Sequence, residues 1–138
     1  EKFYEECTEC SPESDGTHII DVRGLSFKRY LDIAKLTGCK VAVMTDNDKD
    51  YQKHCVDKYK DYASDTNIAI FFETDNTKRT FEIVLYGDNS ALCDTLFDSP
   101  ASDYMLNNKT EAAYALLSQE NQIVVPNYIK RGIEWIRE

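Results

Sequence analysis

The chain has 138 residues, of which 42% are hydrophobic and 12% aromatic, and it carries a formal net charge of −9. This length allows one domain with a sizeable core and is too short for two, while the composition excludes a disordered chain and apolar runs long enough to span a membrane. Affinity for nucleic-acid phosphates comes mainly from Lys and Arg, so the net negative charge argues against binding of nucleic acid by this domain alone. Such binding would need metal ions, local basic patches or a companion domain.

The N-terminal segment is polar and carries two of the five cysteines. The chain begins at Glu1 without an initiator Met or a signal peptide, which predicts that residues 1–138 are one domain cut from a larger cytoplasmic protein. Residues 5–17 are predicted to form a loop after a short helical start. Cys7 and Cys10 have CxxC spacing, but no second pair of zinc ligands accompanies them. We therefore expect ordinary reduced thiols here.

The next segments predict a strand, a helix and a second strand. Residues 18–23 are predicted to form a strand that Gly24 closes. Apolar side chains recur at helical spacing over residues 26–36, and Gly38 supplies a helix stop. Residues 40–45 form the second strand. Together they predict a βαβ unit with a right-handed crossover, and therefore a parallel sheet.

The remainder continues the alternation of helices and strands. Residues 51–62 are predicted to be helical, and residues 67–72 to form a third strand. Residues 73–79 have the composition of a turn, and residues 80–86 fit either a strand or the start of a buried helix. Three more helices are predicted, over residues 90–97, 109–117 and 127–137.

An apolar strand that delivers acidic side chains just past its end is the most informative feature of this sequence. Asp46 and Asp48 follow the predicted strand at alternate positions, and the alternation of side chains along an extended chain would place both on one side. Such like charges repel unless a cation lies between them, and oxygen ligands favour Mg²⁺, Mn²⁺ or Ca²⁺ over zinc. Strand ends of this kind are the usual ligand sites of open α/β sheets.

Three other interpretations of the acidic segment stay open. An EF-hand loop also begins with D-x-D-x-D, but Tyr51 stands where that loop needs Gly, and Asp57 where it needs Glu. A solvated surface turn is the second. A phosphoaspartate site of the receiver or haloacid-dehalogenase type is the third, since those sites also place acids at strand ends.

The acidic motif and the segments before it resemble the Toprim domain, a metal-binding fold shared by topoisomerases, primases and several nucleases. The resemblance is closest to the Toprim domain of the OLD (overcoming lysogenisation defect) family of ATP-dependent endonucleases, and it extends over nearly the whole chain, including the predicted last helix. Asp46-Asn47-Asp48 matches the DxD of that family, and residues 24–31, Gly38 and residues 40–48 are similar to its glycine, helix and strand. This resemblance implies an α/β, Rossmann-like fold in which helices flank a mainly parallel sheet.

Three more positions carry the resemblance. Glu1 matches the second Glu of the family's EGxxE motif, whose first Glu would lie upstream, so the isolated fragment is expected to bind metal poorly. Glu82, in Thr80-Phe81-Glu82, resembles a Ser/Thr-x-Glu element that adds a carboxylate to a second metal ion. Lys109 resembles a lysine that faces the reacting phosphate. The metal ligands that the resemblance implies are Glu1, Asp46, Asp48 and Glu82, and the catalytic residues are Asp46, Asp48, Glu82 and Lys109.

The function that the resemblance implies is endonucleolytic hydrolysis of DNA with two Mg²⁺ or Mn²⁺ ions, Ca²⁺ being a structural alternative. It also implies an N-terminal ABC-type ATPase domain that binds ATP and forms a homodimer, in a protein of phage defence or DNA processing. The chain itself has no GxxxxGK[ST] loop for ATP. Another Toprim activity, as in a primase or an RNA nuclease, and a non-catalytic receiver or interaction module remain as alternatives.

Overall fold

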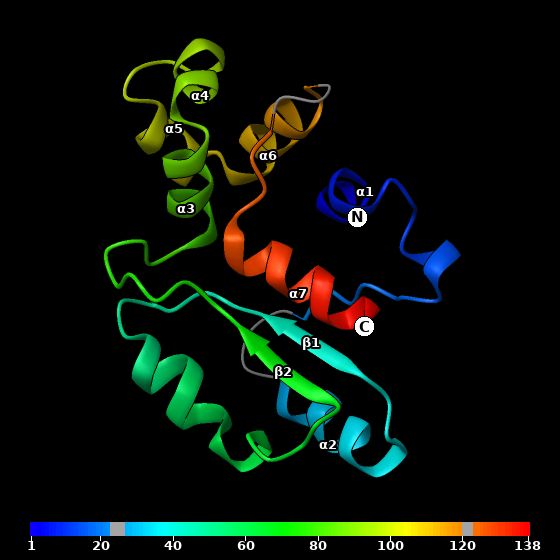
Figure 1. Ribbon diagram of the computed structural model, residues 1–138. Coiled ribbons are helices and arrows are strands. Elements are labelled where there is room, and N and C mark those ends of the chain that lie inside the picture. Colours follow the sequence, from blue (N-terminus) through cyan, green and yellow to red (C-terminus); the bar gives the residue numbers. More distant parts are fainter. Residues whose placement is uncertain (23–26, 120–122) are drawn as a thin grey trace.

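A two-stranded parallel sheet with helices on both faces organises the chain in the computed structural model, which describes residues 1–22, 27–119 and 123–138 (Figure 1). The elements in chain order are α1 (Lys2–Thr8), η1 (Glu13–Asp15), α2 (Phe27–Thr37), β1 (Val41–Met44), η2 (Gln52–Val56), η3 (Asp57–Tyr62), β2 (Ile68–Phe71), α3 (Phe81–Asp88), α4 (Ser90–Leu96), α5 (Ala101–Asn107), α6 (Lys109–Leu117) and α7 (Asn127–Arg137). Among the described residues, no helix is long and apolar enough to cross a membrane.

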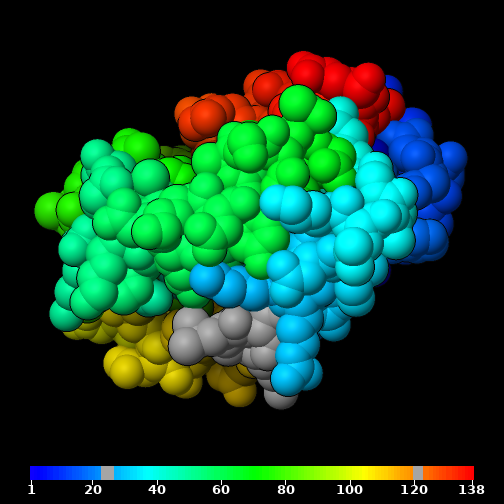
Figure 2. Space-filling model, turned by 90° about the horizontal axis from the view of Figure 1, so that it is seen from below, coloured from blue at the N-terminus to red at the C-terminus, as the bar shows by residue number. Residues whose placement is uncertain are grey.

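The sheet pairs two segments that the sequence predicts as strands. β1 runs parallel to β2, with Val41 opposite Ile68 and Met44 opposite Phe71. The helical turns η2 and η3 connect the two strands, because parallel strands need a crossover rather than a hairpin. Seen from below, β2 and the loop after it (green) lie between that connection (teal) and α2 with the start of β1 (blue to cyan) (Figure 2). The predicted α/β fold is confirmed.

The predicted first strand is wrong over residues 18–22. These residues have no regular secondary structure and pair with neither β1 nor β2. Ile19 and Ile20 are 53% and 58% exposed, so the apolar pair that suggested a strand covers no core. A strand needs a neighbouring ladder and a packed face, and neither is present for these residues. Arg23 and Gly24, the end of the predicted strand, lie outside the described residues.

Most of the predicted helices form where the sequence places them. Residues 109–117 and 127–137 are helical with the predicted bounds, and the ambiguous segment after residue 79 is the helix α3. The connection over residues 51–62 is helical as predicted, but it winds as a π-helical turn followed by a 3-10 helix. The short helix α5, over Ala101–Asn107, was not predicted.

Helix α7 approaches the sheet closely because it has no side chain at Gly132. A Cβ added there would lie 2.6 Å from Met44 Cε and 3.2 Å from the ring of Phe71, so this glycine lets the helix rest on both strands. One apolar cluster lies between α7, α1 and the sheet; a second lies on the α2 side, and a third joins α3 to α6. This packing directs the N-terminal end of α7 toward the ends of the strands.

Candidate functional site

The DxD segment lies at the edge of the sheet where both parallel strands end (Figure 1). From this edge the loop after β1 leads to η2, and the loop after β2 leads to α3. A cavity of about 390 Å³ opens there, and both Asp46 and Asp48 line it. The remaining lining residues are Phe27, Met44, Thr45, Phe81, Tyr128 and Ile129. Two carboxylates thus share one small volume whose walls are both polar and apolar.

A left-handed turn brings Asp48 to this cavity. β1 ends at Met44, and Asp48 and Lys49 have positive φ angles of 49° and 74°. The N–H of Asp50 donates to the carbonyl of Asn47 at 2.9 Å and closes the turn. Both acids line the same cavity, but this turn brings them there. The predicted cause, alternation of side chains along an extended strand, is wrong. Asp and Asn are among the side chains that tolerate positive φ best, so the motif suits this turn.

Asn47, between the two acids, fastens the turn to the loop after β2. Its side chain is 1% exposed. Its Nδ2 amide donates to three carbonyl oxygens, those of Glu73 at 2.9 Å, Asp75 at 2.9 Å and Lys78 at 3.4 Å. Its Oδ1 accepts the N–H of Lys49 at 3.0 Å. The middle residue of the motif therefore fixes the backbone that carries both carboxylates.

The Asp46 carboxylate is destabilised in its charged form. Burial, and after it the negative charge of Glu82, raises the pKa of Asp46 above its ordinary value. The backbone amide of Phe81 lowers that pKa, the charge of Asp48 raises it and the charge of Lys109 lowers it. These effects act in both directions and the net shift is upward. Four of the residues predicted for the site are thus electrostatically coupled.

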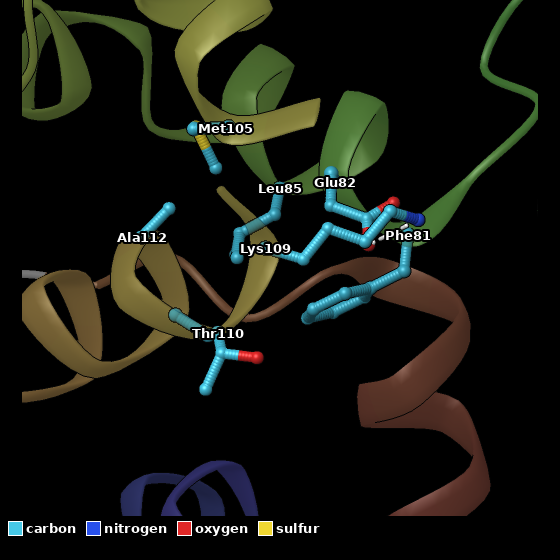
Figure 3. Close-up of a pocket in the computed structure, with 8 residues that line it drawn as sticks. Phe81, Glu82, Leu85, Met105, Lys109, Thr110 and Ala112 are labelled. Carbon is cyan, nitrogen blue, oxygen red and sulfur yellow. Dashed lines mark ion pairs between the residues drawn. The ribbon is translucent and has the colours of Figure 1, made fainter. Parts of the chain in front are cut away.

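Glu82 and Lys109 form an ion pair beside this carboxylate. Glu82 lies in the first turn of α3, and Lys109, the first residue of α6, reaches across to it, with its Nζ 2.9 Å from Glu82 Oε1 (Figure 3). Burial raises the pKa of Glu82, but the hydrogen bond from Lys109 and smaller contributions from the Glu82 backbone amide and Thr80 outweigh it, so the pKa is lowered. Glu82 Oε2 and Thr80 Oγ1 are buried, and neither has a hydrogen-bond partner among the described residues.

A second cavity, of about 340 Å³, lies between the first residues of α3 and of α6 and shares Phe81 with the first cavity (Figure 3). Its lining residues are Phe81, Glu82, Leu85, Met105, Lys109, Thr110, Ala112 and Ala113. Phe81 lines both cavities and forms a wall between them. The Glu82–Lys109 pair therefore lines a mostly apolar cavity, separate from the one that Asp46 and Asp48 line.

The predicted ligand Glu1 lines neither cavity. It is exposed at the N-cap of α1, and this helix reaches the site through Phe3, whose ring lies 6.0 Å from that of Phe81 in an edge-on contact. Within the described ranges, no three side chains of His, Cys, Asp and Glu are grouped closely enough to hold one metal ion. A role for Glu1 as a metal ligand stays a prediction.

Tyr128 belongs to the site but was not identified from the sequence. It is 6% exposed, lines the acidic cavity, and its pKa is raised by burial and then by the charges of Asp46, Glu73 and Glu82. In the same helix, Ile129 and Ile133 are buried in the core. Only the close approach of α7 to the strand ends reveals the second role of its first turn.

The donor atoms at this edge suit a hard divalent cation. Asp46 and Asp48 offer carboxylate oxygens to one cavity, and Glu82 adds a buried oxygen that has no partner among the described residues. All are oxygen ligands, the class that Mg²⁺, Mn²⁺ and Ca²⁺ prefer. A cation bound by Asp46 and Asp48 would relieve repulsion that disfavours the charge on Asp46.

Replacing Asp46 by Asn is expected to stabilise the metal-free chain at neutral pH. A raised pKa means that the folded state holds the proton of Asp46 more tightly than the unfolded state, so stability falls as the pH rises above the ordinary value of 3.8. Asn keeps the shape and loses the charge. In thermal unfolding with EDTA, we expect a melting temperature higher by on the order of a few degrees. The difference should shrink as the pH is lowered and Asp46 becomes protonated; an unchanged or lower melting temperature at neutral pH would contradict it.

Comparison with known proteins supports the family that the motifs resemble. Residues 1–48 match the family model for the TOPRIM domain of overcoming lysogenization defect protein-like proteins. The matched region includes α2, β1 and the DxD motif. No curated protein and no solved structure matches the chain. Toprim domains generally bind divalent metal ions such as Mg²⁺, which agrees with the carboxylate donors at the strand ends. Over these 48 residues, which are about a third of the chain, the sequence is similar to a Toprim domain of the OLD-like family.

Proposed function

We propose that the chain is the catalytic domain of a divalent-metal-dependent DNA endonuclease. The observation that carries this proposal is that Asp46 and Asp48 line one cavity at the strand ends, while the Glu82–Lys109 pair acts electrostatically on Asp46. These groups come from β1, α3 and α6, which are distant in the sequence. A receiver module would give Glu82 no role at such a site, so the arrangement favours phosphodiester chemistry over a phosphoaspartate.

Each residue has a defined part in the proposed reaction. Asp46, Asp48 and Glu82 would hold Mg²⁺ or Mn²⁺, with Glu1 as a further ligand and Ca²⁺ as a structural substitute. When bound, such ions activate water and neutralise negative charge on the phosphate and the leaving oxygen. Lys109 would stabilise charge on the phosphate. The buried Asn47 keeps the two aspartates in place, because its hydrogen bonds fix the turn that carries them.

The net charge of −9 makes metal loading a condition for contact with DNA at this site. Bulk affinity for DNA would come from elsewhere in the longer cytoplasmic protein that we propose. In that protein an N-terminal ABC-type ATPase domain would bind ATP, form the homodimer and control cleavage. Its biological role would be phage defence or DNA processing.

Nicking of supercoiled plasmid DNA by the full-length protein tests the proposal. We expect open circular product with Mg²⁺ or Mn²⁺ and none with EDTA, because the carboxylates need cations in order to accept a phosphate. Parallel reactions on single-stranded RNA and on a primed template with nucleotides distinguish an RNA nuclease and a primase. Metal-dependent cleavage of RNA alone, or nucleotide polymerisation, would replace the proposed activity by another Toprim activity.

A further inference from the structure

The two oxygens of the Glu82 carboxylate have different surroundings. Oε1 accepts a hydrogen bond from the ammonium of Lys109 at 2.9 Å, whereas Oε2 is buried and has no hydrogen-bond partner in the part of the chain that the structure describes. A buried carboxylate oxygen without a partner is unfavourable. The lysine therefore contacts only one of the two oxygens.

The charges around Asp46 do not balance. Asp46, Asp48 and Glu82 are three carboxylates, and Lys109 is the cation among the charged groups that act on Asp46. One ammonium group carries a single charge and cannot neutralise three acids. A divalent ion carries twice that charge and accepts oxygen ligands from several side chains at once.

Lys109 can leave Glu82 without any change in the backbone. Its side chain is 57% exposed, whereas that of Glu82 is 14% exposed. Its flexible four-carbon chain runs along the mouth of the second cavity from the first residue of α6 (Figure 3). An ion pair with an exposed lysine contributes little to stability, so a stronger cation can displace it.

We propose that the Lys109 ammonium is a placeholder for a divalent cation at Glu82, and that metal binding releases it toward the bound phosphate. This inference rests on the proposed function, since it assumes that the carboxylates hold metal ions. It assigns Lys109 two successive positions. In the metal-free protein it covers Glu82 and lowers metal affinity; in the metal-loaded protein it is free to contact the substrate.

Calorimetric titration of the full-length protein with Mn²⁺ alone tests the first position. Lys109→Met removes the charge and keeps the length of the side chain, so it should bind Mn²⁺ about five- to tenfold more tightly than the wild type. Lys35→Met is the matched control, because Lys35 pairs with Asp65 at 3.1 Å with similar side-chain exposures of 50% and 18%, and Asp65 precedes the opposite end of β2. The control should bind Mn²⁺ as the wild type does.

The acetylation rate of Lys109, followed by mass spectrometry, tests the second position. Saturating Mn²⁺ should raise that rate severalfold, while Lys35 should react equally with and without the ion. In Glu82→Gln the Lys109 amine should react fast already in the metal-free protein.

Different failures have different meanings. Equal or weaker Mn²⁺ binding by Lys109→Met, or a Lys109 amine whose reactivity ignores the ion, overturns the placeholder while leaving the metal site intact. Absence of Mn²⁺ binding in both proteins rejects the metal site, and with it both this inference and the proposed function. Tighter binding together with slower DNA cleavage by Lys109→Met is the result that we expect, because the variant loses the ammonium that faces the phosphate.

Discussion

Asp46→Asn and Asp48→Asn in the full-length protein are each expected to lower metal-dependent nicking of plasmid DNA by about two to three orders of magnitude. Each change removes one of the two carboxylates that line the cavity at the strand ends. Asn is preferable to Ala here because Asp48 has a φ of 49°, which Asn tolerates well. Initial rates of open-circle formation at saturating Mg²⁺ measure the effect.

The matched control for these variants is Asp50→Asn, the same chemical change in the same turn. Asp50 is exposed and lines neither cavity; its Oδ1 accepts the N–H of Lys53 at 3.1 Å, a bond that Asn can keep. Its cleavage rate should stay within about twofold of the wild type, as for other surface changes that keep their contacts. Full activity of Asp46→Asn or Asp48→Asn would reject the proposed site.

Stability measurements separate a lost active site from a lost fold. Asp46→Asn should have a higher melting temperature than the wild type, because the raised pKa of Asp46 means that its charged carboxylate destabilises the folded state. An inactive variant with increased stability is the expected pattern where a site keeps like charges close together for function. Loss of activity with loss of the folded signal would instead indicate damage to the turn.

The local elements of this fold could be predicted because local sequence determines them. Short apolar runs predict the strands β1 and β2, and apolar residues at helical spacing predict the helices α6 and α7. The segment over residues 18–22 shows the limit of this approach, since Ile19 and Ile20 have strand propensity but no ladder to join.

The site was predicted in part, and for two different reasons. Asp46 and Asp48 could be proposed from the residues themselves, because two acids directly after an apolar strand are typical of a metal site in an α/β fold. Glu82 and Lys109 lie far along the chain and follow no spacing rule; only the family resemblance indicated them. Their contact depends on how α3 and α6 pack around a shared apolar cluster, which no local pattern describes.

Asn47 was overlooked because the DxD pattern leaves its middle position open. Its importance depends on three carbonyl groups of the loop after β2, which turn toward its amide only in the folded chain. Asn47→Ala removes these donors and leaves the carbonyl oxygens without that partner, so we expect the free energy of unfolding to fall by about 2–4 kcal/mol. Urea unfolding of the metal-free chain, followed by circular dichroism, measures this loss.

The same substitution should also weaken metal binding, since a residue that orients ligands commonly contributes about 10- to 100-fold to metal affinity. Asn67→Ala provides the control: its amide also donates to two carbonyls, those of Ala34 at 3.0 Å and Cys39 at 2.8 Å, but at the opposite end of β2. Asn67→Ala should cost stability and leave Mn²⁺ affinity unchanged. If Asn47→Ala lost stability but bound Mn²⁺ as the wild type does, Asn47 would only stabilise the fold, and the position of Asp46 and Asp48 would not depend on it. A loss of both, seen only at Asn47, would show that the hydrogen bonds of one buried amide hold the two carboxylates in the geometry that the metal requires.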